Sequence, residues 1–284
     1  MNVDFDLMKN IFKKGGKTYY YSSMFFPKDI RRDVSILYSF VRKADDYVDD
    51  IPQQTTEFYE FKIKYEEALT SGKRSSNRVI DAFIDLMNRQ GFEEEWVDAF
   101  LHSMELDIVK SKYETIEELK EYLYGSAEVI GLMMAKILDL PEKSHRAARH
   151  LGRAMQYANF IRDIEEDIKL NRQYLPTEDL KRYNLNSLKL SETQNKKENF
   201  TKFIDEQVNR FEDWQEIAED GFHYIPKRYL IPIKTASDMY KWTARGIRRK
   251  PYVVYDRKLK PSKARIVING LLNFIHPRKI TTKV

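Results

Sequence analysis

Apolar residues recur along the chain with the spacing of amphipathic helices. In the clearest case the apolar positions follow a 4-3-4-3-4 spacing, at Ile30, Val34, Leu37, Val41, Ala44 and Val48. Pro27 stands just before this segment, where the start of a helix tolerates proline. The pattern therefore predicts a helix over residues 28–48 that borders a hydrophobic core.

Start and stop signals predict further helices. Thr115 followed by Glu118 has the spacing of a capping box and predicts a helix near residues 116–138. A helical segment from His145 to Leu170 is expected to stop before Pro176, because proline cannot continue a helix. Two more segments have helical patterns, residues 200–222 and 228–249.

The remaining segments complete an all-helical picture. Residues 186–200 are polar and predict a surface loop or a short connecting segment. Pro251 and Pro261 interrupt the chain before a last apolar segment at residues 266–275. No run of residues alternates cleanly between apolar and polar, as a half-buried strand would. We therefore predict an all-α, single-domain, multi-helix bundle over residues 1–284.

Composition supports this picture and narrows the chemistry. The 284 residues include only 10 Gly and 9 Pro, which favours long helices over many short strands. The absence of cysteine excludes disulfides, thiolate metal sites and cysteine nucleophiles, and it agrees with a reducing compartment. The first residues lack a signal-peptide pattern, and the apolar stretch 129–140 is too short to span a bilayer. We expect a cytoplasmic protein.

Charge is distributed unevenly. Residues 241–284 hold seven Lys, six Arg and one Asp, a net charge of +12, whereas the whole chain carries only +5. This basic C-terminal segment is either a solubilising tail or a contact for anionic lipid or phosphate. No nucleic-acid-binding motif accompanies it, so a nucleic-acid partner is not expected.

Two acidic clusters carry the most specific chemical signal. One contains Asp45 and Asp49 and the other Asp163 and Asp167, each pair with a spacing that places two carboxylates one helical turn apart. Like charges at this spacing repel, and Asp is a poor helix former. Each cluster is therefore either a solvated acidic face or a site for a compensating cation.

Helical geometry places both clusters beside the core. Stepping about 100° per residue gives one polar stripe that flanks the apolar stripe of its helix, namely Tyr38, Arg42, Asp45 and Asp49. It gives a second polar row on a helix that is otherwise largely apolar, namely Gln156, Asn159, Asp163 and Asp167. Buried carboxylates without partners are too unfavourable to persist, so this row must face a partner or a wet cavity.

The types of ligand narrow the choice of cation. Carboxylate oxygens suit Mg²⁺, Mn²⁺ or Ca²⁺, but no glycine follows the first cluster in the register of an EF-hand loop. Carboxylates on helices that leave coordination positions open fit Mg²⁺ that bridges to the phosphates of a substrate. The five histidines show no His-Glu-x-x-His spacing.

Four segments that contain these residues resemble the squalene/phytoene synthase family, the head-to-head prenyl diphosphate synthases. In chain order they are residues 41–49, 122–134, 156–167 and 172–176. The resemblance runs from about Tyr19 to Arg265. It implies an isoprenoid-synthase fold with a central cavity, in which Mg²⁺ ions on opposite walls grip the diphosphates of two allylic prenyl substrates.

The resemblance also implies roles for individual residues. The metal ligands are Asp45, Asp49, Asp163 and Asp167. The residues that assist metal and diphosphate binding are Arg42, Asn159 and Thr18. The residues around the reacting carbons and the closing flap are Tyr122, Gln156, Tyr174 and Tyr240.

Within this family the chain looks most like a phytoene synthase. The segments 248–255 and 260–263 are closer to phytoene synthases than to squalene synthases, and small Ser23 and Ser35 leave room for C20 tails. We therefore predict Mg²⁺-dependent joining of two geranylgeranyl diphosphates to phytoene through a cyclopropyl intermediate, a step of carotenoid biosynthesis. Because the product is apolar, peripheral contact of the basic segment with an anionic membrane is also expected.

Several alternatives remain at this point. The enzyme could use farnesyl diphosphate to make dehydrosqualene, or squalene with NADPH as reductant. Head-to-tail prenyltransferases and terpene cyclases also use Asp-rich helices with Mg²⁺, but segments 122–127 and 172–176 argue against both classes. A non-catalytic assembly or scaffold protein of the same fold would be expected to lose motif aspartates, which this chain keeps.

Overall fold

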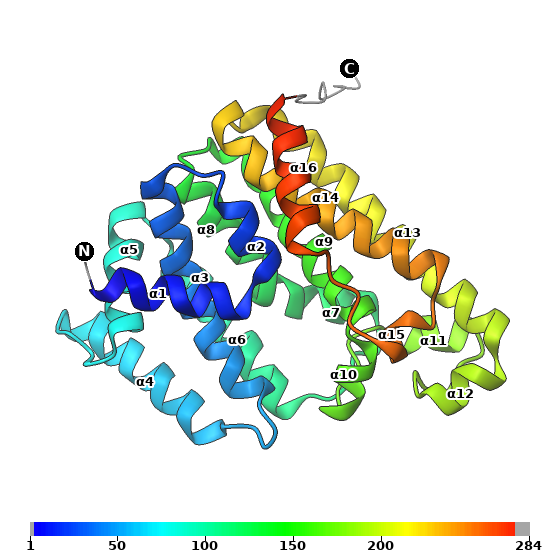
Figure 1. Cartoon of the computed structure of the whole chain (residues 1–284). Helices are drawn as coiled ribbons and strands as arrows, with labels where there is room; N and C mark the ends of the chain where they lie inside the picture. Colours follow the sequence, from blue (N-terminus) through cyan, green and yellow to red (C-terminus); the bar gives the residue numbers. More distant parts are fainter. Residues whose placement is uncertain (1–2, 276–284) are drawn as a thin grey trace.

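The computed structural model describes residues 3–275, and every regular element within them is helical (Figure 1). The predicted all-α bundle is confirmed. The helices are α1 Val3–Gly15, α2 Lys17–Ser23, α3 Lys28–Asp49, α4 Thr55–Ser71, α5 Arg78–Gln90, α6 Glu94–Val109, α7 Ile116–Leu123, α8 Val129–Ile137, α9 His145–Arg162, α10 Ile164–Lys169, α11 Thr177–Arg182, α12 Leu190–Asn195, α13 Lys197–Asp220, α14 Lys227–Arg249, α15 Val253–Asp256 and α16 Lys263–Ile275. Short helical turns of other types lie at Tyr124–Glu128, Glu142–Ser144 and Gly221–Tyr224.

The strongest periodic patterns match the structure closely. The helix predicted over residues 28–48 is α3, and its apolar stripe, including Leu37, Ala44 and Val48, is buried. The helix predicted over residues 228–249 is α14, which accommodates Pro232 near its beginning. Both helices bury one face, as their sequence patterns indicate.

The predicted capping box is half correct. The Thr115 hydroxyl accepts a hydrogen bond from the backbone N–H of Glu118 at 3.2 Å, so the helix does begin there. The Glu118 carboxylate does not reach back to the N–H of Thr115. It accepts from the N–H of Glu114 instead, and so it caps the chain one residue earlier.

The helical stretch 116–138 contains a π-helical turn at Tyr124–Glu128. At this turn the chain runs against α6, and a Cβ atom placed on Gly125 would lie 2.0 Å from the carbonyl oxygen of Ala99. Only glycine allows the two backbones to approach so closely. The π turn is a local defect of the kind that often accompanies functional sites.

The prediction of a single helix between His145 and Leu170 is wrong. Helix α9 ends at Arg162 and α10 begins at Ile164, with Asp163 between them at φ −100° and ψ 15°. An Asp side chain competes for hydrogen bonds near its own backbone and favours helix ends over helix interiors. The acidic row is therefore carried by two helices with a bend between them.

Residues 186–200 are more ordered than the predicted loop. They contain α12, and α13 begins at Lys197. Thr193 and Phe200 are both fully buried, so tertiary packing orders a segment whose own pattern is weak.

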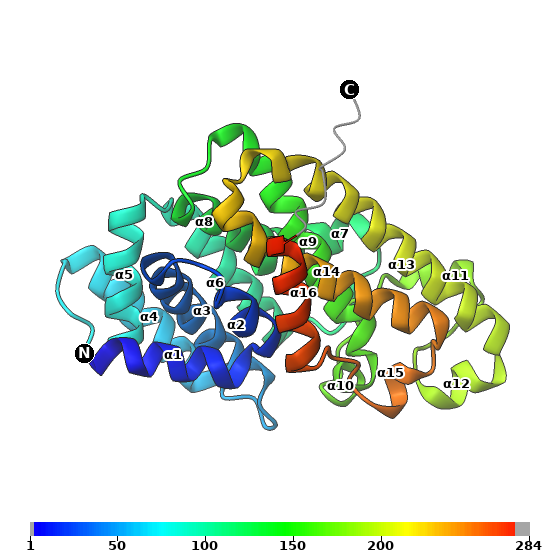
Figure 2. The same ribbon diagram turned by 45° about the horizontal axis from the view of Figure 1, so that its top comes forward.

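Two hydrophobic cores flank a central space. One core lies among α1, α3 to α6 and α8, and includes Phe40 and Phe83. The other lies mainly among α7, α9 to α11, α13 and α14, and includes Phe160 and Phe203. Figures 1 and 2 show α1 to α6 on one side of the molecule and α9 to α15 on the other. Among residues 3–275, no helix combines the length and apolar character needed to cross a membrane.

Candidate active site

A cavity of about 470 Å³ lies between the two cores, within the usual size range of small-molecule sites. Every residue that the sequence assigned to the site lines it, namely Thr18, Arg42, Asp45, Asp49, Tyr122, Gln156, Asn159, Asp163, Asp167, Tyr174 and Tyr240. They come from α2, α3, α7, α9, α10, α14 and the segments beside α10. The fold thus brings the predicted residues together, and their individual roles stay predictions.

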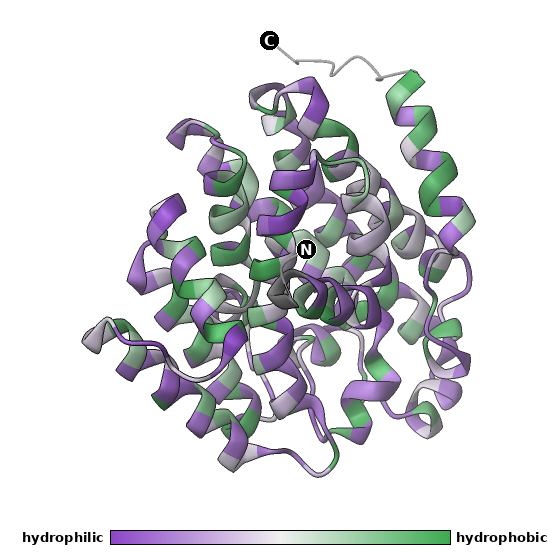
Figure 3. Ribbon diagram, turned by 60° about the vertical axis from the view of Figure 1, so that its left-hand side comes forward, coloured by the Kyte–Doolittle hydropathy of each residue, from purple (hydrophilic) through white to green (hydrophobic). Residues whose placement is uncertain are grey.

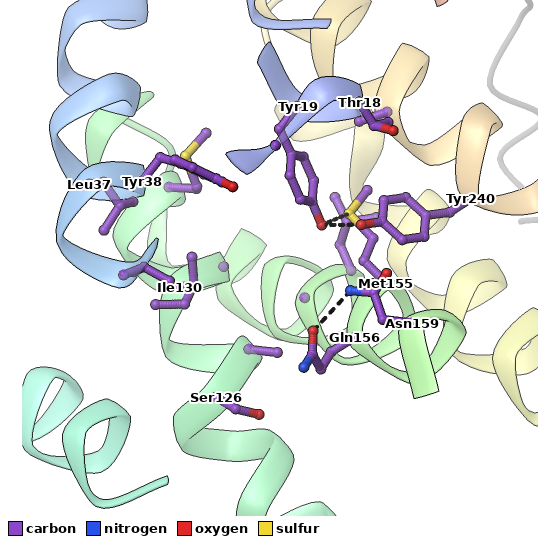
Figure 4. Close-up of a pocket in the computed structure, with 18 of the residues that line it drawn as sticks. Thr18, Tyr19, Leu37, Tyr38, Ser126, Ile130, Met155, Gln156, Asn159 and Tyr240 are labelled. Carbon is purple, nitrogen blue, oxygen red and sulfur yellow. Dashed lines mark hydrogen bonds between the residues drawn. The ribbon is translucent and has the colours of Figure 1, made fainter. Parts of the chain in front are cut away.

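The cavity lining divides by chemistry. Apolar side chains from α3, α6 and α8 line one part, among them Leu37, Phe100 and Ile130. Figure 4 shows Leu37 and Ile130 across the cavity from Tyr19 and Tyr240. The ionisable side chains gather at the end of α3 and at the bend between α9 and α10. A ligand with an apolar body and an anionic end fits this division.

The two serines proposed to make room for a long tail differ in position. Ser23 lines the cavity, as expected. Ser35 does not, and that part of the prediction is wrong. Its hydroxyl donates to the carbonyl of Arg31 at 2.7 Å. Ser39, one turn further along the same face, donates to the carbonyl of Met8, so this face of α3 is turned towards α1.

The end of α3 forms the first acidic wall. Arg42 pairs with Asp45 at 2.8 Å and with Asp46 at 2.5 Å, and Arg172 pairs with Asp49 at 2.7 Å. The partial negative charge at the C-terminal end of a helix also destabilises carboxylates there. Burial, and then the charge of Asp49, raise the pKa of Asp45 to about 8, although Arg42 acts in the opposite direction.

The bend between α9 and α10 forms the second acidic wall. The guanidinium of Arg162 donates to both carboxylate oxygens of Asp163, at 2.7 and 2.5 Å, and Lys258 approaches the same carboxylate at 3.2 Å. Burial, and then the charge of Asp163, raise the pKa of Asp167 well above its ordinary value. Asp163 is thus paired with two cations, whereas burial and the neighbouring Asp163 disfavour the ionised form of Asp167.

A buried network around Asp107 was missed by the sequence analysis. Tyr122 and Tyr174 each donate a hydroxyl hydrogen bond to the Asp107 carboxylate, both at 2.7 Å. Burial raises the pKa of Asp107 to about 6, while nearby Arg172 lowers it. Asp107 lies on α6, outside the four segments that resemble the family. The available signal was an acidic residue between two apolar ones, Leu106 and Ile108, on a buried helix.

Arg172 joins the acidic wall of α3 to this network. It lies in the segment after α10, where Gln173 forms an isolated parallel bridge with Lys112. Besides its ion pair with Asp49, the buried guanidinium donates to the Tyr174 hydroxyl at 3.3 Å. The sequence placed Arg172 in a motif but assigned it no role.

Two tyrosines from distant parts of the chain meet over the cavity. Tyr240 on α14 donates to the hydroxyl of Tyr19 on α2 at 2.7 Å, and Tyr19 donates to the Met155 sulfur at 3.7 Å (Figure 4). Below them, the Asn159 side-chain N–H donates to Gln156 at 3.1 Å. Tyr19 was not predicted as a site residue, because nothing near it in the sequence indicates its partner.

The site residues fit a divalent cation. Among residues 3–275, no three acidic or histidine side chains converge into a ready-made metal site. The aspartates stand instead as one pair on each wall, and Mg²⁺ commonly uses one or two carboxylates together with substrate phosphates. The buried side-chain oxygen of Asn159 has no hydrogen-bond partner in the described structure, so it is available to a cation near the second wall. A cation would also relieve the mutual repulsion of the carboxylates.

The basic segment 241–284 is not a uniform charged surface. Lys258 and Lys260 line the cavity, so part of the segment faces the acidic walls. Arg248 forms ion pairs with Asp205 and Glu212 on α13. Residues 276–284 lie outside the described residues.

Comparison with protein families identifies one match. The family model described as squalene/phytoene synthase matches residues 12–265. The 15-cis-phytoene synthase of Synechocystis sp. is 26% identical over 270 residues, which cover 89% of this chain and 79% of that protein. The phytoene synthase of Pseudescherichia vulneris is 27% identical over 263 residues, which cover 88% of this chain and 84% of that protein.

Solved structures share the fold. A dehydrosqualene synthase crystallised with a ligand superposes with a TM-score of 0.85 at 24% identity, covering 97% of both chains. The squalene synthase HpnC from Alicyclobacillus acidocaldarius gives a TM-score of 0.73 at 20% identity, covering 88% of this chain and 94% of that one. At these identities the likeness shows the fold alone.

Proposed function

The chain belongs to the squalene/phytoene synthase family, and on that premise we propose that it is a phytoene synthase, a prenyltransferase that joins two geranylgeranyl diphosphates head to head. One observation carries the proposal for this chain. One cavity is lined by an aspartate pair from each of two walls, together with apolar, basic and aromatic side chains. The product class would place the enzyme in carotenoid biosynthesis.

The aspartate pairs are the proposed metal ligands. Asp45 and Asp49 on one wall, and Asp163 and Asp167 with Asn159 on the other, would hold Mg²⁺, with Mn²⁺ as a substitute. When bound, the ion supplies charge stabilisation for the departing diphosphate. No three acidic or histidine side chains of the described residues converge on one point, so diphosphate oxygens would complete the coordination of the ion.

Basic side chains of the chain itself would orient the two diphosphates. Arg42 and Arg162 lie beside the two aspartate pairs, and Lys258 and Lys260 line the same cavity. Each of these groups can donate to phosphate oxygens and stabilise the negative charge that develops on them. Thr18 on α2 lines the cavity and is the proposed hydroxyl contact for a diphosphate.

Aromatic faces would protect the allylic cation left after diphosphate departs. Phe160 and Tyr174 stack at 4.1 Å between ring centroids, and Tyr122 lies 5.3 Å from Tyr174. All three rings line the cavity, and the negative face of an aromatic ring attracts a cation. The Asp107 carboxylate accepts a hydrogen bond from each of the two tyrosine hydroxyls and so fixes how the rings are held. The apolar lining limits the access of water, which would quench the cation.

A single assay tests this function. The purified protein is incubated with labelled geranylgeranyl or farnesyl diphosphate and Mg²⁺, with and without NADPH, and the products are separated by chromatography. We expect phytoene from the C20 substrate without NADPH, and no product from Asp45→Ala or Asp163→Ala. Preferential formation of dehydrosqualene, or of squalene only with NADPH, would overturn the C20 assignment. A folded wild type that makes no product would point to a scaffold role.

We also propose that residues 1–284 act as one isoprenoid-synthase domain in the cytoplasm, peripheral to a membrane. The support is that both cores contribute to one cavity. A product as apolar as phytoene partitions into lipid, which favours release at a membrane surface.

A further inference from the structure

Helix α16 carries its apolar stripe on the outside. Its exposed side chains include five large apolar ones, with Phe274 67% and Ile275 64% exposed; the others are Ile268, Leu271 and Leu272. Its buried positions are Ile266, Gly270 and Asn273, two of which are small or polar. Figure 3 shows the hydrophobic residues, in green, along this helix at the right-hand edge of the view. An ordinary surface helix has the opposite arrangement.

The inward face of α16 fixes this orientation. The Asn273 side chain donates to the Thr235 hydroxyl at 3.3 Å and to the Asp238 carboxylate at 3.1 Å, both on α14. A Cβ atom added to Gly270 would lie 2.2 Å from the ring of Phe25, so the helix is seated closely against the chain after α2. Rotating α16 to hide its apolar stripe would break these bonds and force side chains into that contact.

Positive charge accompanies the apolar stripe. Lys263 and Arg265 are exposed in the first turn of α16, and residues 257–275 contain no acidic residue. A second copy of this basic face offers no complementary charge to Lys263 and Arg265. An anionic lipid surface instead satisfies both the apolar stripe and the charge.

We propose that the outer face of α16 docks this protein on an anionic lipid bilayer. The helix has 13 residues and is therefore about 20 Å long, too short to cross a hydrocarbon core of about 30 Å. It lies in the plane of the interface, with the apolar stripe among the acyl chains and the basic residues at the headgroups.

Docking through α16 sets the cavity beside the bilayer. α16 packs against α2 and α14 (Figures 1 and 2), and both helices supply cavity-lining residues, including Tyr19 and Tyr240. In the docked protein, the wall formed by α2 and α14 therefore lies between the cavity and α16 on the lipid side. Release of an apolar product on this side rests on the proposed function. The docking proposal rests only on the exposed face of α16.

Vesicle co-sedimentation of the full chain, without substrate or metal, tests the docking surface. The vesicles are phosphatidylcholine alone or phosphatidylcholine with one quarter phosphatidylglycerol, at low and high salt. Leu272→Glu, at a position 53% exposed on α16, is compared with the matched control Ile63→Glu, at a position 51% exposed on α4. We expect wild type and Ile63→Glu to bind the anionic vesicles equally, and Leu272→Glu to lose about tenfold in bound fraction.

Other outcomes would overturn the docking proposal. They are equal binding of Leu272→Glu and wild type, no binding of wild type to anionic vesicles, or a wild-type dimer on size-exclusion chromatography that Leu272→Glu dissociates. Unchanged thermal unfolding of both variants establishes that each is folded. Product formation, measured separately in detergent solution, reports on the proposed function, so failure of one proposal is distinguished from failure of the other.

Discussion

Neutralising a proposed metal ligand should stabilise the protein in the absence of metal while it abolishes activity. Asp45 shares the cavity with several other carboxylates, and Arg42 is its direct ion-pair partner. The change Asp45→Asn keeps the size of the side chain and removes its charge. Arg42 keeps its second partner, Asp46, at 2.5 Å, so no buried cation is left unpaired.

The size of the effect follows from the pKa of Asp45. Burial, and then the charge of Asp49, raise this pKa from 3.8 to about 8. At pH 7 the unfolded chain has the group ionised while the folded chain holds it protonated, which disfavours folding by roughly 4 kcal/mol before screening. Because 33% of the side chain is exposed, solvent screening reduces the figure to about 2 kcal/mol.

The sign of the pH dependence is fixed by the same shift. A carboxyl group whose pKa is raised on folding destabilises the folded state only above its unfolded pKa of 3.8, and increasingly so up to about pH 8. The advantage of Asp45→Asn over wild type in the free energy of unfolding should therefore grow from about 1 kcal/mol at pH 5 to about 2 kcal/mol at pH 7.

Urea denaturation in EDTA at the two pH values measures this difference. Asp213→Asn, at an exposed position on α13, is the control and should change stability by less than about 0.5 kcal/mol. Added Mg²⁺ with inorganic diphosphate should raise the unfolding temperature of wild type but not of Asp45→Asn. A variant less stable than wild type in EDTA, or an advantage that does not change with pH, would refute the reasoning.

Three further predictions concern the metal, the packing and the buried network. EDTA should abolish product formation and Mg²⁺ should restore it, with the helical circular dichroism unchanged throughout. Gly125→Ala should lower the free energy of unfolding by about 1–3 kcal/mol or more, and the unfolding temperature with it, because the new Cβ would lie 2.0 Å from the carbonyl oxygen of Ala99. An unchanged free energy of unfolding would contradict the close approach. Asp107→Leu should destabilise by about 2–6 kcal/mol in denaturant titrations, because the hydroxyls of Tyr122 and Tyr174 lose their acceptor, whereas Asp107→Asn keeps one acceptor and should lose less than half as much.

Local patterns determined the helical class, the course of α3 and α14 and the acidic spacings of the site. These features depend on backbone geometry within a few turns, where a 3.6-residue period decides which face is buried. The same reasoning placed Asp45 and Asp49 beside the core, and the structure finds both in the cavity lining. The family segments, read in order, then indicated which residues would meet.

Only the tertiary structure decided the features that depend on contacts between distant segments. Tyr19 and Tyr240 are 221 residues apart and form one hydrogen bond, and Asp107 is recognisable as a site residue only through the hydroxyls that approach it. The bend at Asp163 likewise interrupts a helix that the apolar period would continue.

The outward apolar face of α16 shows the limit most clearly. Its sequence has the apolar period of an ordinary amphipathic helix. Such a period predicts that one face is apolar, but it does not predict whether that face packs on the core or lies outside. The direction was set by Asn273 and Gly270, which fit against α14 and the chain after α2 and so leave the larger side chains outside. Packing against segments that are distant in the sequence leaves no local sequence pattern, because these contacts form only when the chain folds.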